Sequence, residues 1–398
     1  MLSKDINLIK EYKLKTGRTL FFSPGSAKFW LDIVPKSFSV NYYDKELISM
    51  RLEISGLCNG QCKYCIVYGN KVEKKDVLDI TNSWDWFFVQ SWFKNLKDIF
   101  IIGGEPMLYF NDIIFILENF SGTVSFVTNG TLITKEKAEK LAQYDVMVYV
   151  SIDGTKASDN NNRIYKDGTF MYDDIVRGLD YLEKAGVKKG LFMVATPNTV
   201  YNVSEVLIEF VDKYELKRIG YSLPHWTQNE VDIVTAKQYR DALLEIYIHR
   251  QRIKTEVIQL NWRLNPLRDG KVKEFACSLH TQQITVLPDK SIVRCSKIDS
   301  SPDLNVATND WLNKNCPTAL AKRKIEPCES CIALACCGGG CPFDGIKRFN
   351  SAIDKRECIV TIPLIEKAIQ DIIFSLENEY KHLPTGTIST DIIKKILK

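Results

Sequence analysis

From about residue 48 onward, short apolar runs alternate with segments of helical periodicity. Each apolar run ends in Gly, Pro or Asn, as buried parallel strands typically do. Six runs are predicted as strands, over 48–57, 98–106, 123–130, 146–154, 190–198 and 218–224. Helical patterns lie between them, over 84–97, 135–144, 172–186 and 203–216. Strands that alternate with helices indicate parallel β/α units, so the fold class is α/β, with a partial (β/α)6 barrel.

Polar motifs follow the first four predicted strands. CNGQCKYC (58–65) follows the first strand, GGEP (103–106) the second, TNG (128–130) the third and SIDG (151–154) the fourth. Ligands of parallel β/α sheets bind at the carboxyl ends of the strands. The four motifs are therefore predicted to meet in one site.

The character of the chain changes after a helix predicted near 237–253. Residues 266–360 hold nine of the twelve cysteines and many turn residues, which indicates a loop-rich domain held by metal. A last helix is predicted over 363–380. The expected divisions are an N-terminal extension, a barrel core, a cysteine-rich domain and a tail that caps a core or frays: 1–47, 48–265, 266–380 and 381–398.

Composition narrows the class of protein. The 398 residues are 45% hydrophobic and 26% charged, with a net charge of +4, too small to indicate nucleic acid or membrane as a partner. No apolar run is long enough to span a membrane, and the first residues lack a signal-peptide pattern, so a cytoplasmic protein is expected. Twelve cysteines in a reducing compartment favour metal or redox chemistry over disulfides. The four histidines form no close pair, which disfavours a His-rich zinc site or a His-based triad.

The first cysteine group has three members, Cys58, Cys62 and Cys65, and no further cysteine follows until Cys277. Thiolates favour zinc, copper(I) or iron–sulfur clusters. A structural zinc site needs four protein ligands, whereas a four-iron cluster held by three cysteines leaves one iron open to a small molecule. The alternative is three buried cysteines on a loop.

The C-x3-C-x2-C spacing, with Tyr64 before the last cysteine, resembles the radical S-adenosylmethionine (SAM) enzymes. The resemblance implies that Cys58, Cys62 and Cys65 hold a [4Fe-4S] cluster, and that SAM chelates the open iron through its amino and carboxylate groups. It further implies that an electron from the cluster splits SAM into methionine and a 5′-deoxyadenosyl radical, which abstracts hydrogen from an unactivated C–H bond.

The same resemblance implies a set of SAM contacts. They are Tyr64, Gly103, Gly104, Glu105, Ser151 and Arg163. The glycines would let backbone approach the methionine part, Glu105 would accept from its ammonium, and Arg163 would pair with its carboxylate. The alternatives are a tight turn at GGEP and a surface arginine at 163. Asp153 is expected to shape the turn, and TNG carries little weight because Asn-Gly is a common turn.

The C-terminal cysteines resemble the SPASM domain, an extension of radical SAM enzymes that carries auxiliary iron–sulfur clusters. By that resemblance one cluster is held by Cys328, Cys331, Cys337 and Cys358. A second is held by Cys277, Cys295 and Cys341, with Cys316 as the candidate fourth ligand. An open iron that binds a substrate thiolate is the alternative to Cys316. Zinc is the alternative metal for this domain, because C-x2-C pairs also occur in zinc ribbons.

Two positions in the cysteine-rich region fall outside the two predicted sets of cluster ligands. Lys290 stands where the family usually has Gly, so the turn there would place Lys290 in a less comfortable backbone state. Cys336 is left over and is expected to be a buried or indirectly supporting thiol.

Radical SAM enzymes with such a domain act mostly on peptides or proteins. The sequence therefore predicts a peptide maturase that makes an oxidative thioether or carbon–carbon crosslink in a ribosomally made peptide, with a reductant such as flavodoxin or ferredoxin as a further partner. An anaerobic sulfatase-maturing enzyme, which converts Cys or Ser to formylglycine, is the alternative. A non-enzymatic iron–sulfur or zinc protein is the alternative of another class. Residues 1–47 could add a strand to a leader peptide or simply cover the barrel, and no spacing singles out a catalytic base.

Overall fold

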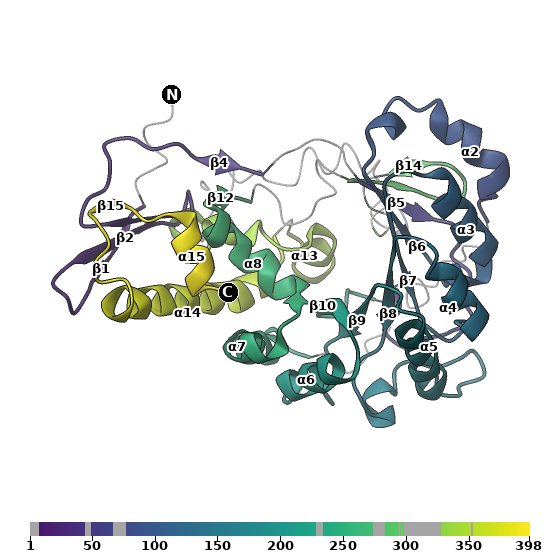
Figure 1. Ribbon diagram of the computed structural model, residues 1–398. Coiled ribbons are helices and arrows are strands. Elements are labelled where there is room, and N and C mark those ends of the chain that lie inside the picture. Colours follow the sequence, from purple (N-terminus) through teal and green to yellow (C-terminus); the bar gives the residue numbers. More distant parts are fainter. Residues whose placement is uncertain are drawn as a thin grey trace.

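The computed structural model describes residues 8–43, 49–66, 77–227, 234–273, 283–293, 295, 297, 328–351 and 353–398 (Figure 1). Two parts lie side by side in Figure 1, a larger one built on a long parallel sheet and a smaller one built on a short antiparallel sheet. Helices α7, α8 and α13 lie between them in this view.

The large sheet has nine strands in the order β11-β10-β9-β8-β7-β6-β5-β13-β14. Every neighbouring pair is parallel except β13 with β14. Its strands are β5 (Ser49–Glu53), β6 (Asp98–Ile102), β7 (Thr123–Thr128), β8 (Val146–Ser151), β9 (Lys189–Val194), β10 (Leu216–Ser222), β11 (Glu256–Val257), β13 (Gln283–Val286) and β14 (Ile292–Val293). Strands β5 to β10 follow chain order, which confirms the six predicted strands and the partial barrel.

Helices connect the parallel strands and line one side of the sheet (Figure 1). They are α2 (Ile80–Phe88), α3 (Phe110–Asn119), α4 (Lys135–Leu141), α5 (Tyr172–Lys184), α6 (Val203–Lys213) and α7 (Ala236–Ile253). Short 3-10 helices are η1 (Phe93–Asn95), η2 (Pro106–Tyr109) and η3 (Ala157–Asn160). Helix α5 buries Ile175, Leu179 and Leu182, the residues whose helical spacing predicts it. Helix α3 was not among the helices predicted from the sequence.

The small sheet joins the two ends of the described chain. Its order is β1-β2-β3-β15, and all its pairs are antiparallel. The strands are β1 (Lys10–Lys13), β2 (Thr19–Ser23), β3 (Lys28–Leu31) and β15 (Gly386–Thr387). Helix α15 (Thr390–Ile396) follows β15 and buries Ile393. Residues of the predicted tail thus pack against residues of the predicted N-terminal extension.

The described residues of the cysteine-rich region lie mainly in helices. Its elements, with the segments that lead into it, are β4 (Asn41–Tyr42), α8 (Ile258–Asp269), β12 (Lys271–Val272), η6 (Cys328–Ser330), α12 (Leu334–Cys337), α13 (Pro342–Phe349) and α14 (Arg356–Asn378). Strand β12 pairs with β4, and the β13–β14 hairpin extends the large sheet beside β5. In that hairpin Lys290 has a φ of +68°, the left-handed conformation expected from its replacement of Gly.

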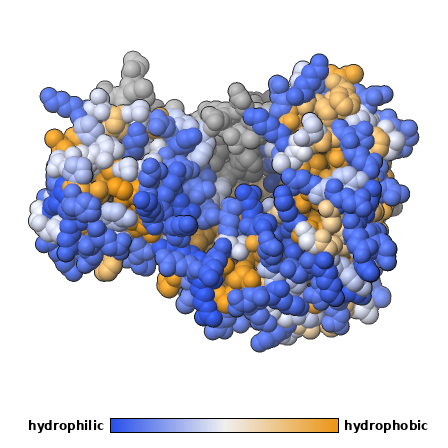
Figure 2. Space-filling view, in the orientation of Figure 1, coloured by the Kyte–Doolittle hydropathy of each residue, from blue (hydrophilic) through white to orange (hydrophobic). Residues whose placement is uncertain are grey.

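Helix α14 begins seven residues before Pro363, where the predicted helix started, and the proline lies inside it. Proline is tolerated there because α14 gains its stability from packing, with nine of its residues buried. The face in Figure 2 is mostly hydrophilic, with hydrophobic patches scattered over both parts. Within the described residues, no helix has the length and apolar character needed to cross a membrane.

Candidate active site

The three-cysteine loop leaves the barrel at the carboxyl end of β5. The backbone N–H groups of Gly104 and Glu105 donate to the carbonyls of Ser55 and Leu57, both at 2.8 Å, and these bonds attach the loop to the end of β6. The three thiols are half-buried. The motifs after the first two strands therefore meet directly, as the strand-end rule predicts.

The thiols lie close enough together to affect one another. Burial raises the pKa of Cys58 to about 12, and the neighbouring Glu105, Cys62 and Cys65 add to that rise. Burial also raises the pKa of Cys62, and the Arg163 guanidinium opposes this rise. The Cys58 sulfur accepts from the Gly60 N–H at 3.2 Å. Three converging thiols, with the pKa of Cys58 and Cys62 raised by burial, suit a cationic cluster core, which supplies the compensating charge.

The GGEP glycines are required by their distance from the cysteine loop. A Cβ at Gly104 would lie 2.0 Å from the Leu57 carbonyl oxygen, and one at Gly103 would lie 2.4 Å from the Ser55 oxygen. Gly103 also has a φ of +129°. The glycines of this motif therefore allow the GGEP segment to pack closely against the backbone of the cysteine loop.

The Glu105 carboxylate is buried and binds the loop after β7. One oxygen accepts from the Met107 N–H at 2.9 Å and the Thr128 hydroxyl at 2.7 Å, and the other accepts from the Asn129 N–H at 2.7 Å. Burial raises the Glu105 pKa, and these hydrogen bonds oppose the rise. Each oxygen can accept two hydrogen bonds, so the oxygen facing Asn129 retains capacity for an ammonium.

Asn129 links the TNG motif to the cysteine loop. Its side-chain nitrogen donates to the Asn59 carbonyl oxygen at 2.8 Å and lies 3.9 Å from the Cys58 sulfur. Asn59 in turn donates to the Thr131 hydroxyl at 2.9 Å. Sequence reasoning gave little weight to TNG and missed Asn59 and Thr131, because a common turn pattern carries no sign of these contacts.

Arg163 and Tyr64 both bind Asp153, at the carboxyl end of β8. Asp153 is fully buried, and it accepts from the Arg163 guanidinium at 2.8 Å, from the Val194 N–H at 3.0 Å and from the Tyr64 hydroxyl. Burial raises the Tyr64 pKa, and the Arg163 charge opposes this rise. Asp153 therefore organises the site around it. Ser151 is half-buried at the end of β8.

The Arg163 side chain retains a donor for a ligand. The side chain is 7% exposed, and its Nε has no hydrogen-bond partner within the described residues. A buried donor without a partner is costly, so its presence near the Cys62 thiol suits a carboxylate ligand such as that of SAM. The residues present thus fit both a three-thiolate cluster and SAM.

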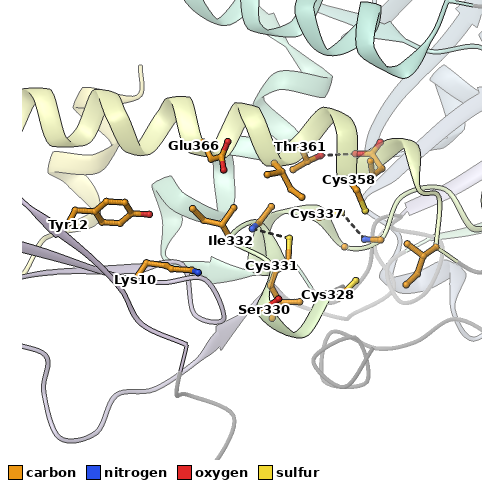
Figure 3. A pocket seen from close by; sticks show the side chains of 17 residues that line it. Lys10, Tyr12, Cys328, Ser330, Cys331, Ile332, Cys337, Cys358, Thr361 and Glu366 are labelled. Carbon is orange, nitrogen blue, oxygen red and sulfur yellow. Dashed lines mark hydrogen bonds between the residues drawn. The ribbon is translucent and has the colours of Figure 1, made fainter. Parts of the chain in front are cut away.

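A second group of thiols lines a cavity of about 460 Å³ beside α14. These are the thiols of Cys328, Cys331, Cys337 and Cys358, the four that the sequence groups into one cluster (Figure 3). The Ala333 and Gly339 N–H groups donate to the Cys331 and Cys337 sulfurs at 3.4 and 3.3 Å.

The cavity walls also bring charge to these thiols. Lys10 of β1 and Glu366 of α14 line the cavity (Figure 3). Burial raises the pKa of Cys331, with Glu366 adding to the rise and Lys10 opposing it. The four-thiolate donor set with N–H···S bonds suits an iron–sulfur cluster.

The remaining cysteines fall into two groups. Burial raises the pKa of Cys341, and the charges of Asp344 and Cys295 add to the rise. Cys336 is fully buried, as expected of a leftover thiol. Cys277 and Cys316, predicted for the same cluster as Cys341, lie outside the described residues.

Comparison with known proteins agrees with this geometry. Residues 52–211 match the radical SAM superfamily. The chain is 26% identical to the radical SAM cyclopropyl synthase TigE of Paramaledivibacter caminithermalis over 200 residues, 45% of this chain and 42% of TigE. It is 24% identical to a cysteine-type anaerobic sulfatase-maturating enzyme of Clostridium perfringens over 274 residues, 60% of this chain and 72% of that enzyme. The chain spans between 42% and 61% of the length of TigE and two other curated relatives that it matches.

Two solved structures share most of the fold. The structure of anSMEcpe with bound AdoMet and Cp18Cys peptide has a TM-score of 0.65 at 20% identity, over 84% of this chain and 99% of that one. Streptococcus suis SuiB bound to precursor peptide SuiA has a TM-score of 0.57 at 18% identity, over 79% and 76% of the two chains. At these identities the likeness concerns the fold. The three-cysteine loop at the end of the first barrel strand lies within residues 52–211, and this part of the chain belongs to the radical SAM superfamily.

Proposed function

We propose that this protein is a peptide maturase that removes hydrogen from a residue of a ribosomally made peptide and leaves an oxidative crosslink. The observation that carries the proposal is the meeting of three thiols, Glu105 and Arg163 at one edge of the barrel, with a second four-thiol cavity in the same chain. The second cavity favours net oxidation, because an auxiliary cluster there could accept the electron that a substrate radical loses.

The residues have separable roles in this proposal. Cys58, Cys62 and Cys65 would hold the [4Fe-4S] cluster, and Arg163 would bind the SAM carboxylate through its unpaired Nε. When bound, the cluster and SAM supply a carbon-centred radical through one-electron cleavage of SAM. Asp153 fixes the direction of the guanidinium, and Glu105 fixes the Asn129 loop against Cys58. Burial of these groups keeps water from the reacting atoms.

A peptide substrate is supported by the two solved relatives, both of which were crystallised with a peptide. The auxiliary clusters, held by a SPASM-like region, are part of the same proposal. Sulfatase maturation is the second candidate. It is favoured by the alignment with the sulfatase-maturating enzyme, which covers 60% of this chain.

The first test is SAM cleavage. Anaerobically reconstituted protein with about twelve irons, three four-iron clusters' worth, should release 5′-deoxyadenosine from SAM when a strong reductant is added. Cys58→Ala, Cys62→Ala and Cys65→Ala should each abolish this product, whereas Cys336→Ala should retain it. Undiminished product from the three variants, or colourless zinc-bearing protein, would show that the site is misassigned.

The second test separates the two candidate reactions. Mass spectrometry of a co-expressed precursor peptide should show loss of two hydrogens without an aldehyde. Formylglycine formation gives an aldehyde that a hydrazine reagent traps, and from Cys it also exchanges sulfur for oxygen. A trapped aldehyde on a sulfatase peptide, with no change in any precursor peptide, would replace the first candidate by the second.

A further inference from the structure

His225 lies where the barrel meets the cysteine-rich region. It follows β10, the sixth parallel strand, and so lies at the same edge of the sheet as the cysteine loop. Its Nδ1 is 2.6 Å from the carboxylate of Asp344, in helix α13. One ligand atom each of His225, Cys341 and Asp344 lies within 4.8 Å of the others. Three potential metal ligands from two parts of the chain therefore converge.

Asp344 is already occupied by protein groups. Its carboxylate is buried and accepts from the Trp226 N–H at 2.7 Å, in addition to its contact with His225. The Arg356 and Arg348 guanidiniums lie 3.2 and 3.5 Å from its oxygens. Because two guanidiniums already balance the negative charge of this carboxylate, it is a weak ligand for a metal ion. Its role here is to orient His225 rather than to bind a metal itself.

His225 has the arrangement of a metal ligand. An imidazole that binds metal through one nitrogen usually donates its other N–H to a carboxylate, which fixes the tautomer and the ring orientation. Donation from Nδ1 to Asp344 leaves Nε2 with the free lone pair. The His225 side chain is 39% exposed, so part of the ring remains uncovered.

The backbone around His225 is also fixed. Arg348 and Arg356 each donate to the Pro224 carbonyl at 3.5 Å, and Asp344 accepts from the N–H of Trp226. The residues before and after the histidine are thus bound by α13 and α14. The ring is held in place before any metal is bound, which reduces the ordering cost of ligation.

We propose that His225 is a ligand of the auxiliary iron–sulfur cluster held by Cys341 and Cys295, in the position for which Cys316 is the sequence candidate. This rests on the proposed function, which places that cluster here. Cys341 comes immediately before α13, and Cys295 lies near it. Replacing a thiolate by a neutral imidazole makes the cluster less negative and raises its reduction potential. A cluster tuned in this way is better suited to accept an electron.

The test uses the full chain with Cys58, Cys62 and Cys65 all changed to Ala, so that only auxiliary clusters are loaded. The reduced protein should show a nitrogen coupling in pulsed electron paramagnetic resonance, and this coupling should change when histidine is labelled with ¹⁵N. His225→Ala should lose the coupling. The matched control is His249→Ala, an exposed histidine of α7, which should keep it.

Two further variants decide between ligands. His225→Cys should keep the iron content, lose the nitrogen coupling and shift the midpoint potential of one cluster to more negative values. Cys316→Ala should leave iron content and coupling unchanged. The proposal is overturned if no histidine coupling is found, if His249→Ala removes it, or if Cys316→Ala loses a cluster while His225→Ala does not. Failure of the wild-type protein to bind iron or cleave SAM would instead refute the proposed function.

Discussion

Replacing Asp153 by Ala tests the buried ion pair between Asp153 and Arg163 at the carboxyl end of β8. The Asp153 side chain is fully buried and the Arg163 side chain is 7% exposed, so the substitution leaves an unpaired guanidinium away from water. It also removes the acceptor for the Val194 N–H and the Tyr64 hydroxyl. Breaking a buried pair by removing one partner typically costs about 3–5 kcal/mol. We expect the free energy of unfolding of the cluster-free protein to fall by that amount.

Two variants calibrate this value. Asp153→Asn keeps an oxygen acceptor but loses the charge, and removal of a charged hydrogen-bond partner costs about 1.5–3 kcal/mol. Asp145→Ala removes a pair with Lys188 in which the side chains are 77% and 55% exposed, and exposed pairs contribute about 0–1 kcal/mol. The expected order of destabilisation is therefore Asp153→Ala, then Asp153→Asn, then Asp145→Ala.

The assay is urea denaturation followed by tryptophan fluorescence, with hydrogen exchange as a local readout. In Asp153→Ala the Val194 amide loses its acceptor, so its exchange should accelerate. The reasoning is refuted if Asp153→Ala falls within about 1 kcal/mol of Asp145→Ala, because Arg163 would then be neutralised by some other group.

Two other predictions concern the cysteine loop and the small sheet. Gly104→Ala places a Cβ 2.0 Å from the Leu57 oxygen, so the backbone just before Cys58 must move and iron per chain should fall by about one third. In Gly168→Ala the Cβ meets nothing within 4 Å, and the φ of +87° strains only a residue far from the thiols in sequence, so this variant should retain full iron. Equal iron in the two variants would contradict the first expectation. The Thr19 N–H, with Arg18, holds the pKa of Asp32 below its ordinary value. The ionised Asp32 carboxylate accepts from the Thr385 hydroxyl, so this contact is stabilised above about pH 4. The stabilisation is lost as the pH falls through the folded-state pKa of Asp32. The protection factor of the β15 amides, which corrects the exchange rate for its intrinsic pH dependence, should therefore fall on acidification. Asp32→Asn should remove this pH dependence by giving low protection already at pH 7, and an unchanged pH profile of protection in the variant would contradict the expectation.

The parallel strands were predictable because their signal is local. Strands buried on both faces read as short apolar runs, and a run ends where the chain turns into polar residues. Strand β6 ends at Ile102, immediately before the GGEP motif. The candidate site was predictable for the same reason, because each of its motifs directly follows a strand and is placed by the end of that strand.

The rest depends on contacts between distant segments. Strand β15 has two residues, and it is a strand only because β3 lies beside it. Helix α8 contains Pro266 and begins without a side-chain cap, so its sequence carries weak helix signals. His225 and Asp344 are separated by 119 positions, and a lone histidine after a strand has no pattern that indicates its partner.

The charged groups of the candidate site differ from its thiols in how they are stabilised. Glu105 and Arg163 are satisfied on one side by protein groups, the first by Thr128 and Asn129 and the second by Asp153. These groups can therefore be oriented before a ligand arrives. The Cys58 sulfur has weaker partners, the Gly60 N–H at 3.2 Å and the Asn129 side-chain nitrogen at 3.9 Å, and burial raises the pKa of Cys58 to about 12. Deprotonation of Cys58 and Cys62 would then accompany the binding of a metal there. Folding thus positions Glu105 and Arg163, whereas the proposed cluster ligands would acquire their reactive form only when a cluster is inserted.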